Sequence, residues 1–180
     1  LNGSMDELAA VPALAEYGGG FRRCAVHQQT QRAFALGEDK QGAEKHPLFI
    51  LDSHLQVIAT VEATVATRPV LDNDDEGPSR DVAVHGDQVI VLTGDCHPEG
   101  PGLRLLDLDG RFLRTIAAGQ FRNPQAVAAS DGRAFVVDEG GYEEDEEEEE
   151  EEEGPIRHVF LVIDIHSGNI LQTVPLQLSG

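Results

Sequence analysis

The sequence lacks the features that would place it in several large classes of protein. It has no tryptophan and one methionine in 180 residues, and its two cysteines, Cys24 and Cys96, are too few for a disulfide framework. We interpret both as reduced thiols. Its apolar runs reach about five or six residues, whereas a bilayer crossing needs about 20. Acidic residues follow Met5, which is the wrong charge for a secretory signal. We therefore expect a soluble intracellular protein, cytoplasmic or nuclear, with no membrane partner.

Motifs for several kinds of catalysis are also missing. The sequence has no Gly-x-Ser-x-Gly elbow, no Gly-x-x-x-x-Gly-Lys phosphate loop and no dinucleotide-binding fingerprint. The triplet at residues 18–20 is Gly-Gly-Gly and precedes a predicted strand rather than a helix. A non-enzymatic protein without a cofactor is the interpretation that these absences favour.

Basic residues are few and scattered. The chain has 13 Lys and Arg residues, two of them lysines, against 33 Asp and Glu residues, and its net charge is −20. Affinity for phosphate depends on clustered basic side chains, so the composition disfavours nucleic acid as a partner.

Much of the negative charge is local. Residues 143–153 are eleven consecutive acids, so the rest of the chain carries −9. Like charges four residues apart repel one another in a helix, and the run has no apolar residue to pack. We predict a disordered acidic insert over residues 139–154. It is either a solvated insertion or an arm that binds a basic partner or Ca²⁺.

An internal repeat is the most informative positive feature. In each of three copies, an aspartate ends an apolar stretch, and a polar turn leads to two apolar residues, any residue, a threonine and another apolar residue. The aspartate and threonine of each copy are Asp52 and Thr60, Asp107 and Thr115, and Asp164 and Thr173. Their separations are 8, 8 and 9 residues. Such repetition is typical of repeat architectures.

Each copy predicts four short, mostly apolar β-strands joined by turns. Strands that are apolar on both faces indicate a sheet that is covered on both sides. The predicted fold is all-β, a β-propeller of three four-stranded antiparallel blades. The predicted blades are residues 21–61, 78–116 and 122–176, within a segment 21–176.

The repeat resembles the NHL type of propeller repeat. The absence of tryptophan removes the usual WD signature, and no paired-glycine-plus-aromatic pattern of the kelch type is present. The residues that carry the resemblance are Val82-Ala83-Val84, Asp109-Gly110-Arg111-Phe112-Leu113, Pro124-Gln125-Ala126-Val127-Ala128 and Asp131-Gly132. The resemblance implies half of a six-bladed ring that binds a protein or peptide on one face. An RNA-binding NHL domain is an alternative that it also implies.

Three blades are too few to close a ring, because propellers have about four to eight. We expect the ring to be completed by a second copy, as a homodimer of six blades, or by sequence beyond this chain. Residues 1–4 precede Met5 and look like an expression scar left at a protease site. Residues 5–20 are expected to form an N-terminal arm, which is a third possible cover for an exposed blade face.

Residues at the starts of the inner strands are the ligand-binding candidates, since loops carry binding specificity in such frameworks. They are Arg22, Arg23, Arg80, Asp81, Arg122 and Asn123. We expect Arg23, Arg80 and Arg122 to occupy corresponding places in the three blades. The sequence thus favours a non-enzymatic module that binds a peptide or protein.

Two histidines are weak metal candidates. His27 and His85 end equivalent inner strands, and histidines that converge in a propeller channel can hold zinc. The third copy has Ser130 at this place, and a structural role in the turn after the strand is the interpretation that we favour for both histidines. A metal-dependent propeller hydrolase, lactonase or lyase is therefore the alternative function.

Overall fold

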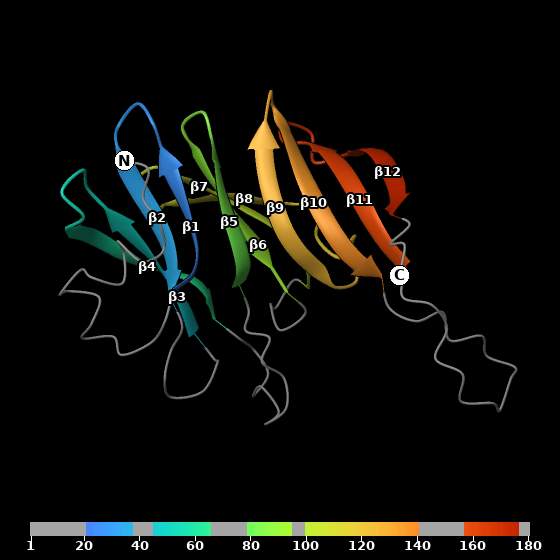
Figure 1. Cartoon of the computed structure of the whole chain (residues 1–180), viewed down its shortest axis with the longest axis horizontal. Coiled ribbons are helices and arrows are strands. Elements are labelled where there is room, and N and C mark those ends of the chain that lie inside the picture. The colour runs from blue at the N-terminus through green and yellow to red at the C-terminus, as the bar shows by residue number, and fades with distance from the viewer. Residues whose placement is uncertain (1–20, 38–44, 66–78, 95–99, 141–156, 177–180) are drawn as a thin grey trace, which may run out of the picture.

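The computed structural model contains three four-stranded antiparallel sheets that lie side by side (Figure 1). It describes residues 21–37, 45–65, 79–94, 100–140 and 157–176. In these ranges no helix has the length and apolarity that a membrane crossing requires. The predicted segments 1–4 and 5–20, and the acidic run, lie outside the described residues.

Each sheet is a meander of four consecutive strands. Blade 1 consists of β1 (Phe21–His27), β2 (Arg32–Gly37), β3 (Lys45–Leu51) and β4 (Val57–Val65). Blade 2 consists of β5 (Ser79–His85), β6 (Gln88–Thr93), β7 (Gly102–Asp107) and β8 (Phe112–Ile116). Blade 3 consists of β9 (Pro124–Ser130), β10 (Arg133–Gly140), β11 (Arg157–Asp164) and β12 (Ile170–Leu176).

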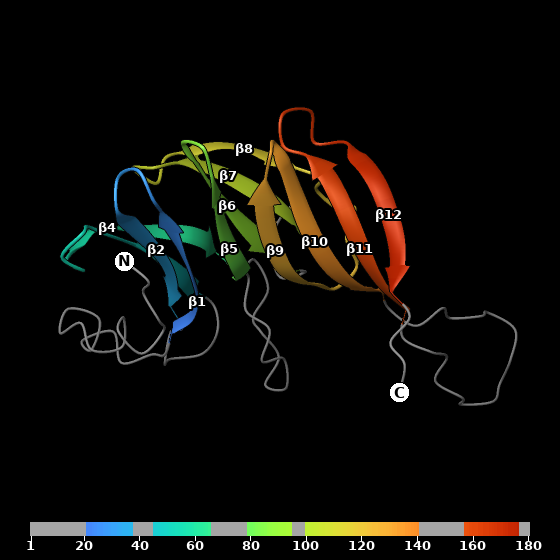
Figure 2. The same ribbon diagram turned by 45° about the horizontal axis from the view of Figure 1, so that its top comes forward.

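The predicted fold class is confirmed: the chain is a partial β-propeller of three blades. The inner strands β1, β5 and β9 lie next to one another, and the outer strands lie away from them (Figures 1 and 2). Two predicted boundaries are wrong. Strand β4 extends to Val65, so blade 1 does not end at residue 61. Strand β10 extends to Gly140, so residues 139 and 140 belong to the sheet and not to the predicted insert.

The repeated aspartates close the hairpin between the third and fourth strands of each blade. The Asp52 carboxylate accepts the N–H groups of His54 and Gln56, at 2.8 and 2.9 Å. Asp107 accepts those of Asp109 and Arg111 at 2.9 and 2.8 Å. The Asp164 carboxylate accepts the N–H of Ser167 at 2.6 Å. The repeat that is visible in the sequence is thus a turn in which the aspartate satisfies backbone donors.

A left-handed residue completes each of these turns and explains the unequal spacing. Leu55 and Gly110 come three residues after the aspartate, with φ of 59° and 83°, whereas Gly168 comes four residues after it, with φ of 77°. The N–H of each donates to the carbonyl of the aspartate, at 3.0, 3.0 and 2.8 Å. The extra residue of the third copy therefore lies inside the turn.

Two of these left-handed residues also touch the preceding blade. A Cβ at Gly110 would collide with Val61 of blade 1, and one at Gly168 would lie 3.0 Å from the Cβ of Ile116 in blade 2. Val61 and Ile116 hold the same register position in β4 and β8. Glycine is needed here both for the positive φ and for the approach of the preceding blade. Blade 1 has Leu55 at this place, where no such approach would be possible.

Two apolar cores hold the three blades together. Side chains alternate between the two faces of each strand, so one set of residues faces the next blade. In blade 1 this set is Phe34, Leu36, Leu48 and Ile50, and in blade 2 it is Ile90, Leu92, Leu103 and Leu105. All eight are 0% exposed. They pack on the following blade, in clusters that include its valines Val89 and Val136.

The outer face of blade 1 and the open face of blade 3 differ in how far their apolar side chains are buried. On the outer face of blade 1, Ala33, Ala35, Phe49 and Leu51 form a third cluster in which each is at most 3% exposed, with Leu55 packed against it. On the open face of blade 3, Phe135, Val137, Phe160 and Val162 hold the register positions of the two buried sets. The first three of these are only partly buried. The open face of blade 3 is therefore the less covered end.

We predict that Asp107→Ala lowers the free energy of unfolding by about 1–2 kcal/mol, because two turn N–H groups lose their acceptor. Asp109→Ala is the matched control. It removes an exposed ion pair with Arg32, which is expected to contribute about 0–1 kcal/mol. Urea unfolding of both variants measures the difference. Equal losses would show that the repeated aspartate does not stabilise the turn.

Candidate functional site

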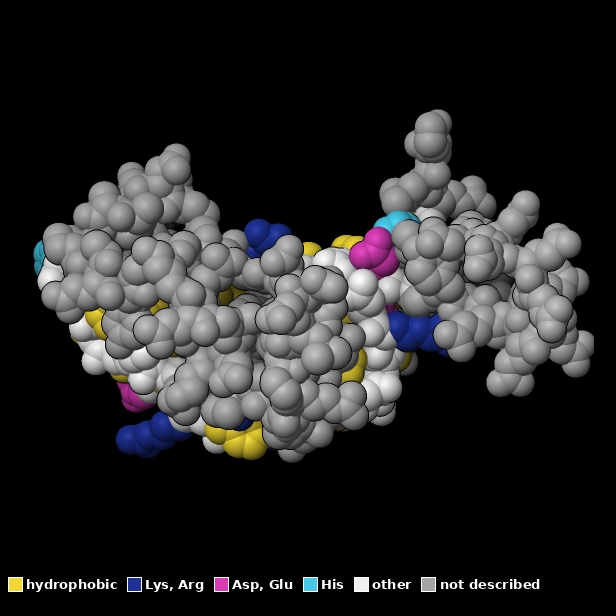
Figure 3. Space-filling model, turned by 90° about the horizontal axis from the view of Figure 1, so that it is seen from below, with side chains coloured by type: hydrophobic (Ala, Val, Ile, Leu, Met, Phe, Trp, Pro, Cys, Tyr) yellow, Lys and Arg dark blue, Asp and Glu magenta, His cyan; other side chains and the backbone are white. Residues whose placement is uncertain are grey.

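The predicted binding residues lie at the end of the molecule where the long connections between strands emerge. Figure 2 shows the tight hairpins at the opposite end. Figure 3 looks at the long-connection end, and most of its surface belongs to residues that the structure does not describe. The described Lys and Arg side chains appear at separate places in this view and form no continuous basic field.

Each inner strand carries a bulge near its start, and the bulges set the true correspondence between blades. The register shifts between Phe21 and Arg23 in β1, between Ser79 and Asp81 in β5, and opposite Val137 and Asp138 in β9. The bulged residues are Arg22, Arg80 and Gln125. The residues that follow them are Arg23, Asp81 and Ala126.

The expected correspondence of Arg23, Arg80 and Arg122 is therefore wrong. Arg23 is equivalent to Asp81, and Arg122 and Asn123 precede the strand instead of lying within it. The bulge lies at the same place in all three blades, so counting back from His27, His85 and Ser130 leads to Arg22, Arg80 and Gln125 without any shift. The prediction was wrong because it compared arginines near the strand starts instead of residues at equal distance from these strand ends.

Asp81 ties all three inner strands together. Its Oδ2 accepts the N–H of Val127 in blade 3 at 2.8 Å, and its Oδ1 accepts the N–H of Val82 at 2.9 Å. The Nε of Arg23 in blade 1 lies 3.7 Å from Oδ1. Burial raises the pKa of the Asp81 carboxyl, and these hydrogen bonds and Arg23 oppose that rise only in part. Asp81 is thus a structural tie, with no free oxygen aimed at solvent.

The remaining ligand-binding candidates differ in how exposed their side chains are to solvent. Arg80 is buried and packs against Gly94, where an added Cβ would lie 2.7 Å from the arginine Nε. Arg23 and Arg122 are exposed, with 56% of the Arg23 side chain accessible. The side chain of Arg22 lies outside the described part of the structure. Among the described candidates, Arg23 and Arg122 are those that a ligand could reach.

A second carboxylate, which the sequence analysis did not single out, organises the start of β9. Asp138 is 4% exposed and accepts the backbone N–H groups of Arg122 and Asn123, at 3.0 and 2.7 Å. The neighbouring Glu139 accepts the side-chain amide of Gln125 at 3.1 Å. Its other oxygen lies 3.9 Å from Nε2 of His158. The signal in the sequence was an aspartate at the end of an otherwise apolar strand.

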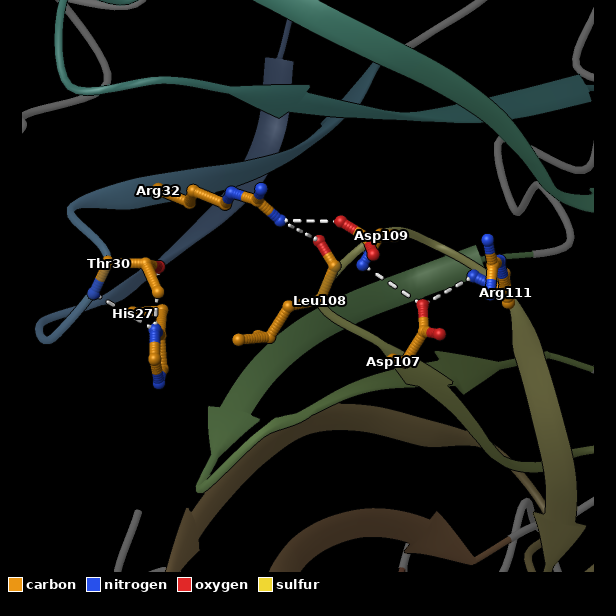
Figure 4. Close-up of polar contacts among 7 residues, drawn as sticks. All are labelled: His27, Thr30, Arg32, Asp107, Leu108, Asp109 and Arg111. Carbon is orange, nitrogen blue, oxygen red and sulfur yellow. Dashed lines mark hydrogen bonds and ion pairs between the residues drawn. The ribbon is translucent and has the colours of Figure 1, made fainter.

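Each of the two metal candidates has a local structural contact. His27 lies with its Nδ1 2.7 Å from the hydroxyl of Thr30, in its own hairpin (Figure 4). The Nε2 of His85 accepts the N–H of Gly132 in the next blade at 2.9 Å. Among the described residues, no group of three or more His, Cys, Asp or Glu side chains could hold a metal ion.

Comparison with known proteins supports the fold. No protein-family model matches the chain, and no curated protein sequence matches it. A chain in the crystal structure of a nidogen/laminin complex is similar, with a TM-score of 0.54 and 12% identity over 86% of this chain and 49% of that one. The computationally designed Ika4 protein is similar at a TM-score of 0.52 and 12% identity, over 85% of this chain and 71% of Ika4.

A third structure is too distant to carry an argument. The Synechocystis apocarotenoid oxygenase has a TM-score of 0.48 and 13% identity, over 88% of this chain and 39% of the oxygenase. The chain thus spans about half the length of the nidogen/laminin match and less of the oxygenase. At these identities the comparisons show the propeller-type fold alone.

We predict that Asp81→Ala lowers the free energy of unfolding by about 1–3 kcal/mol, because the buried N–H of Val127 loses its acceptor. Asp81→Asn keeps one acceptor oxygen and should cost less. Because the folded-state pKa of Asp81 is raised, this group contributes most stability while protonated and loses that contribution as pH rises through its unfolded and folded pKa.

The stability of Asp81→Asn should therefore improve relative to the parent as the pH rises from about 3 to about 7. Urea unfolding across this range tests the sign. A variant that instead falls further behind at the higher pH would mean that Arg23 and the two backbone donors outweigh burial.

Proposed function

We propose that this chain is a non-enzymatic protein-interaction module built from NHL-like propeller repeats. The support for the repeat type is the Asp-Gly turns and the strand pattern of the sequence, which coincide with the observed hairpins. Tight turns at one end and long connections at the other present two distinct surfaces on a common framework.

The observation that carries the proposal is the open face of blade 3. Phe135 and Phe160 stack with their ring centroids 5.9 Å apart, beside Val137 and Val162. The same register positions in blades 1 and 2 are completely buried by the next blade. Full burial of one such side chain contributes about 1.5–3 kcal/mol, so a sheet that covers this face would bind favourably.

A second copy of the chain is the partner that we propose for this face. Completion of a six-bladed ring would require blade 3 to pack on the outer face of blade 1 in the other copy. That face of blade 1 is already buried. It also has Leu55 at the position where blades 2 and 3 have Gly110 and Gly168, the glycines that allow the preceding blade to approach. Pairing of two blade 3 faces about a two-fold axis avoids both obstacles, because such an interface is self-complementary.

The mass in solution tests this pairing. We predict a mass near twice 19.4 kDa at micromolar concentration by light scattering, and a monomer for Phe160→Asp, because a buried charge would oppose the contact. Thr173→Asp, on the opposite face of the same sheet, is the matched control and should remain a dimer. Circular dichroism confirms that each variant is folded.

Leu55→Asn distinguishes the two kinds of dimer, since asparagine tolerates positive φ. The face-to-face dimer should be unaffected, whereas a ring through blade 1 would change its dissociation constant. A parent chain that stays monomeric on concentration would overturn the proposal that a second copy covers blade 3.

A further inference from the structure

A pocket of about 370 Å³ opens between blades 2 and 3 at the tight-turn end, opposite the residues described above. It lies within a single chain, so it does not depend on any dimer. The walls come from the start of β6, from β8, from the β9–β10 turn and from the β11–β12 turn. Its lining residues are Gln88, Arg114, Asp131, Gly132, Arg133, Asp164, Ile165, His166 and Leu171.

The equivalent place between blades 1 and 2 contains an ion pair (Figure 4). The guanidinium of Arg32 donates to the carbonyl of Leu108 at 2.9 Å and to the carboxylate of Asp109 at 2.8 Å. Arg32 begins β2, and Asp109 lies two residues after the repeated Asp107. We call this pair the latch.

Blades 2 and 3 lack the latch because both of its positions have changed. Gln88 is the equivalent of Arg32, since each follows the hairpin and pairs with the histidine that ends the inner strand. His166 is the equivalent of Asp109, two residues after Asp164. The carbonyl of Ile165, equivalent to that of Leu108, still has a donor, because Arg114 reaches it from β8 at 2.7 Å.

Two arginines line the pocket at the place where the latch is absent. Arg133 begins β10 at the register position of Arg32 and Gln88. Arg114 uses one Nη for the carbonyl and has further N–H donors. The Arg133 side chain is exposed and makes no hydrogen bond or ion pair with the described residues. Leu171 adds an apolar wall, with 53% of the residue exposed.

The acidic residues in the lining limit what the pocket can accept. Asp164 is engaged with its own turn, where the N–H of Ser167 lowers its pKa, so its negative charge persists. Asp131 is exposed in the β9–β10 turn. With two arginines and two aspartates the lining is close to neutral, and the chain as a whole carries −20. A polyanion would be repelled, whereas a single carboxylate could pair with the arginines.

We propose that this pocket is a second binding site, which takes a peptide segment carrying one carboxylate side chain next to an apolar side chain. The carboxylate accepts hydrogen bonds from the guanidinium groups of Arg114 and Arg133, and the apolar side chain packs on Leu171. The site lies at the place where blades 1 and 2 have the latch and blades 2 and 3 lack it.

The probe for this site is the capped dipeptide N-acetyl-aspartyl-leucine amide, titrated into the full chain labelled with ¹⁵N. The expected result is saturable shifts of the Gly132, Ile165 and Leu171 amides, with a dissociation constant in the millimolar range suited to so small a ligand. The asparaginyl analogue should bind roughly tenfold more weakly, since it lacks the charge. Arg133→Gln should weaken the aspartyl probe by a similar factor.

Transfer of the latch provides the sharper variant. The double substitution Gln88→Arg with His166→Asp copies the pair that exists at the other interface, and it should fill the pocket and abolish the shifts while the fold is kept. The matched control is Arg32→Gln with Asp109→His, which changes the same two positions between blades 1 and 2 and should leave probe binding unchanged.

Three results would overturn the proposal. One is the absence of saturable shifts in the parent chain. The second is equal binding of the aspartyl and asparaginyl probes, which would remove the role of the arginines. The third is unchanged binding after transfer of the latch, which would place the probe elsewhere. None of these outcomes depends on whether two copies pair through blade 3.

Discussion

The burial of each sheet on both of its faces is the constraint on which the rest of this structure depends. Blade 2 satisfies it completely, since Val89 and Val91 face blade 1 while Ile90 and Leu92 face blade 3, and all four are 0% exposed. Such a strand has no polar face, and so it cannot be stable alone in water. Among the described residues, polar interactions such as Asp81 with Val127 and Arg32 with Asp109 join the blades near the ends of the strands, where backbone groups need partners.

Different polar groups join neighbouring blades at the long-connection end and at the tight-turn end. At the long-connection end the Asp81 carboxylate links Arg23 of blade 1 to the Val127 N–H of blade 3. At the tight-turn end, arginines donate to the carbonyls of Leu108 and Ile165, which follow Asp107 and Asp164. Gly110 and Gly168 let the preceding blade approach. Blade 1 has leucine instead of glycine at this position and a buried outer face. It has the character of a terminal blade, whereas blade 3 retains the apolar face of an internal one.

The fold could be predicted from the sequence because the repeat combines period-two apolar strands with turn residues at fixed places. The unequal Asp-to-Thr spacing was visible in the sequence, but its cause was not, since it depends on which turn residue adopts positive φ. The site residues were less predictable. Asp81 and Arg80 looked like surface residues before a strand, yet β5 already begins at Ser79 and tertiary packing buries both of them. A short-range pattern contains no information about which neighbouring strand a carboxylate will meet.

Departures from the repeat are more informative about function than the repeat itself. Positions that recur in all blades, such as Asp52, Asp107 and Asp164, are explained by the hairpins they close. Gln88 and His166 are not explained in this way, since neither closes a hairpin and their equivalents, Arg32 and Asp109, form an ion pair between blades 1 and 2. The pocket lies where this pair would be, and Arg133, which has no partner among the described residues, lies in its lining. A contact that is present at one blade interface and absent from the equivalent place at the next directs attention to that place, because functional sites commonly occur where a repeated pattern is broken.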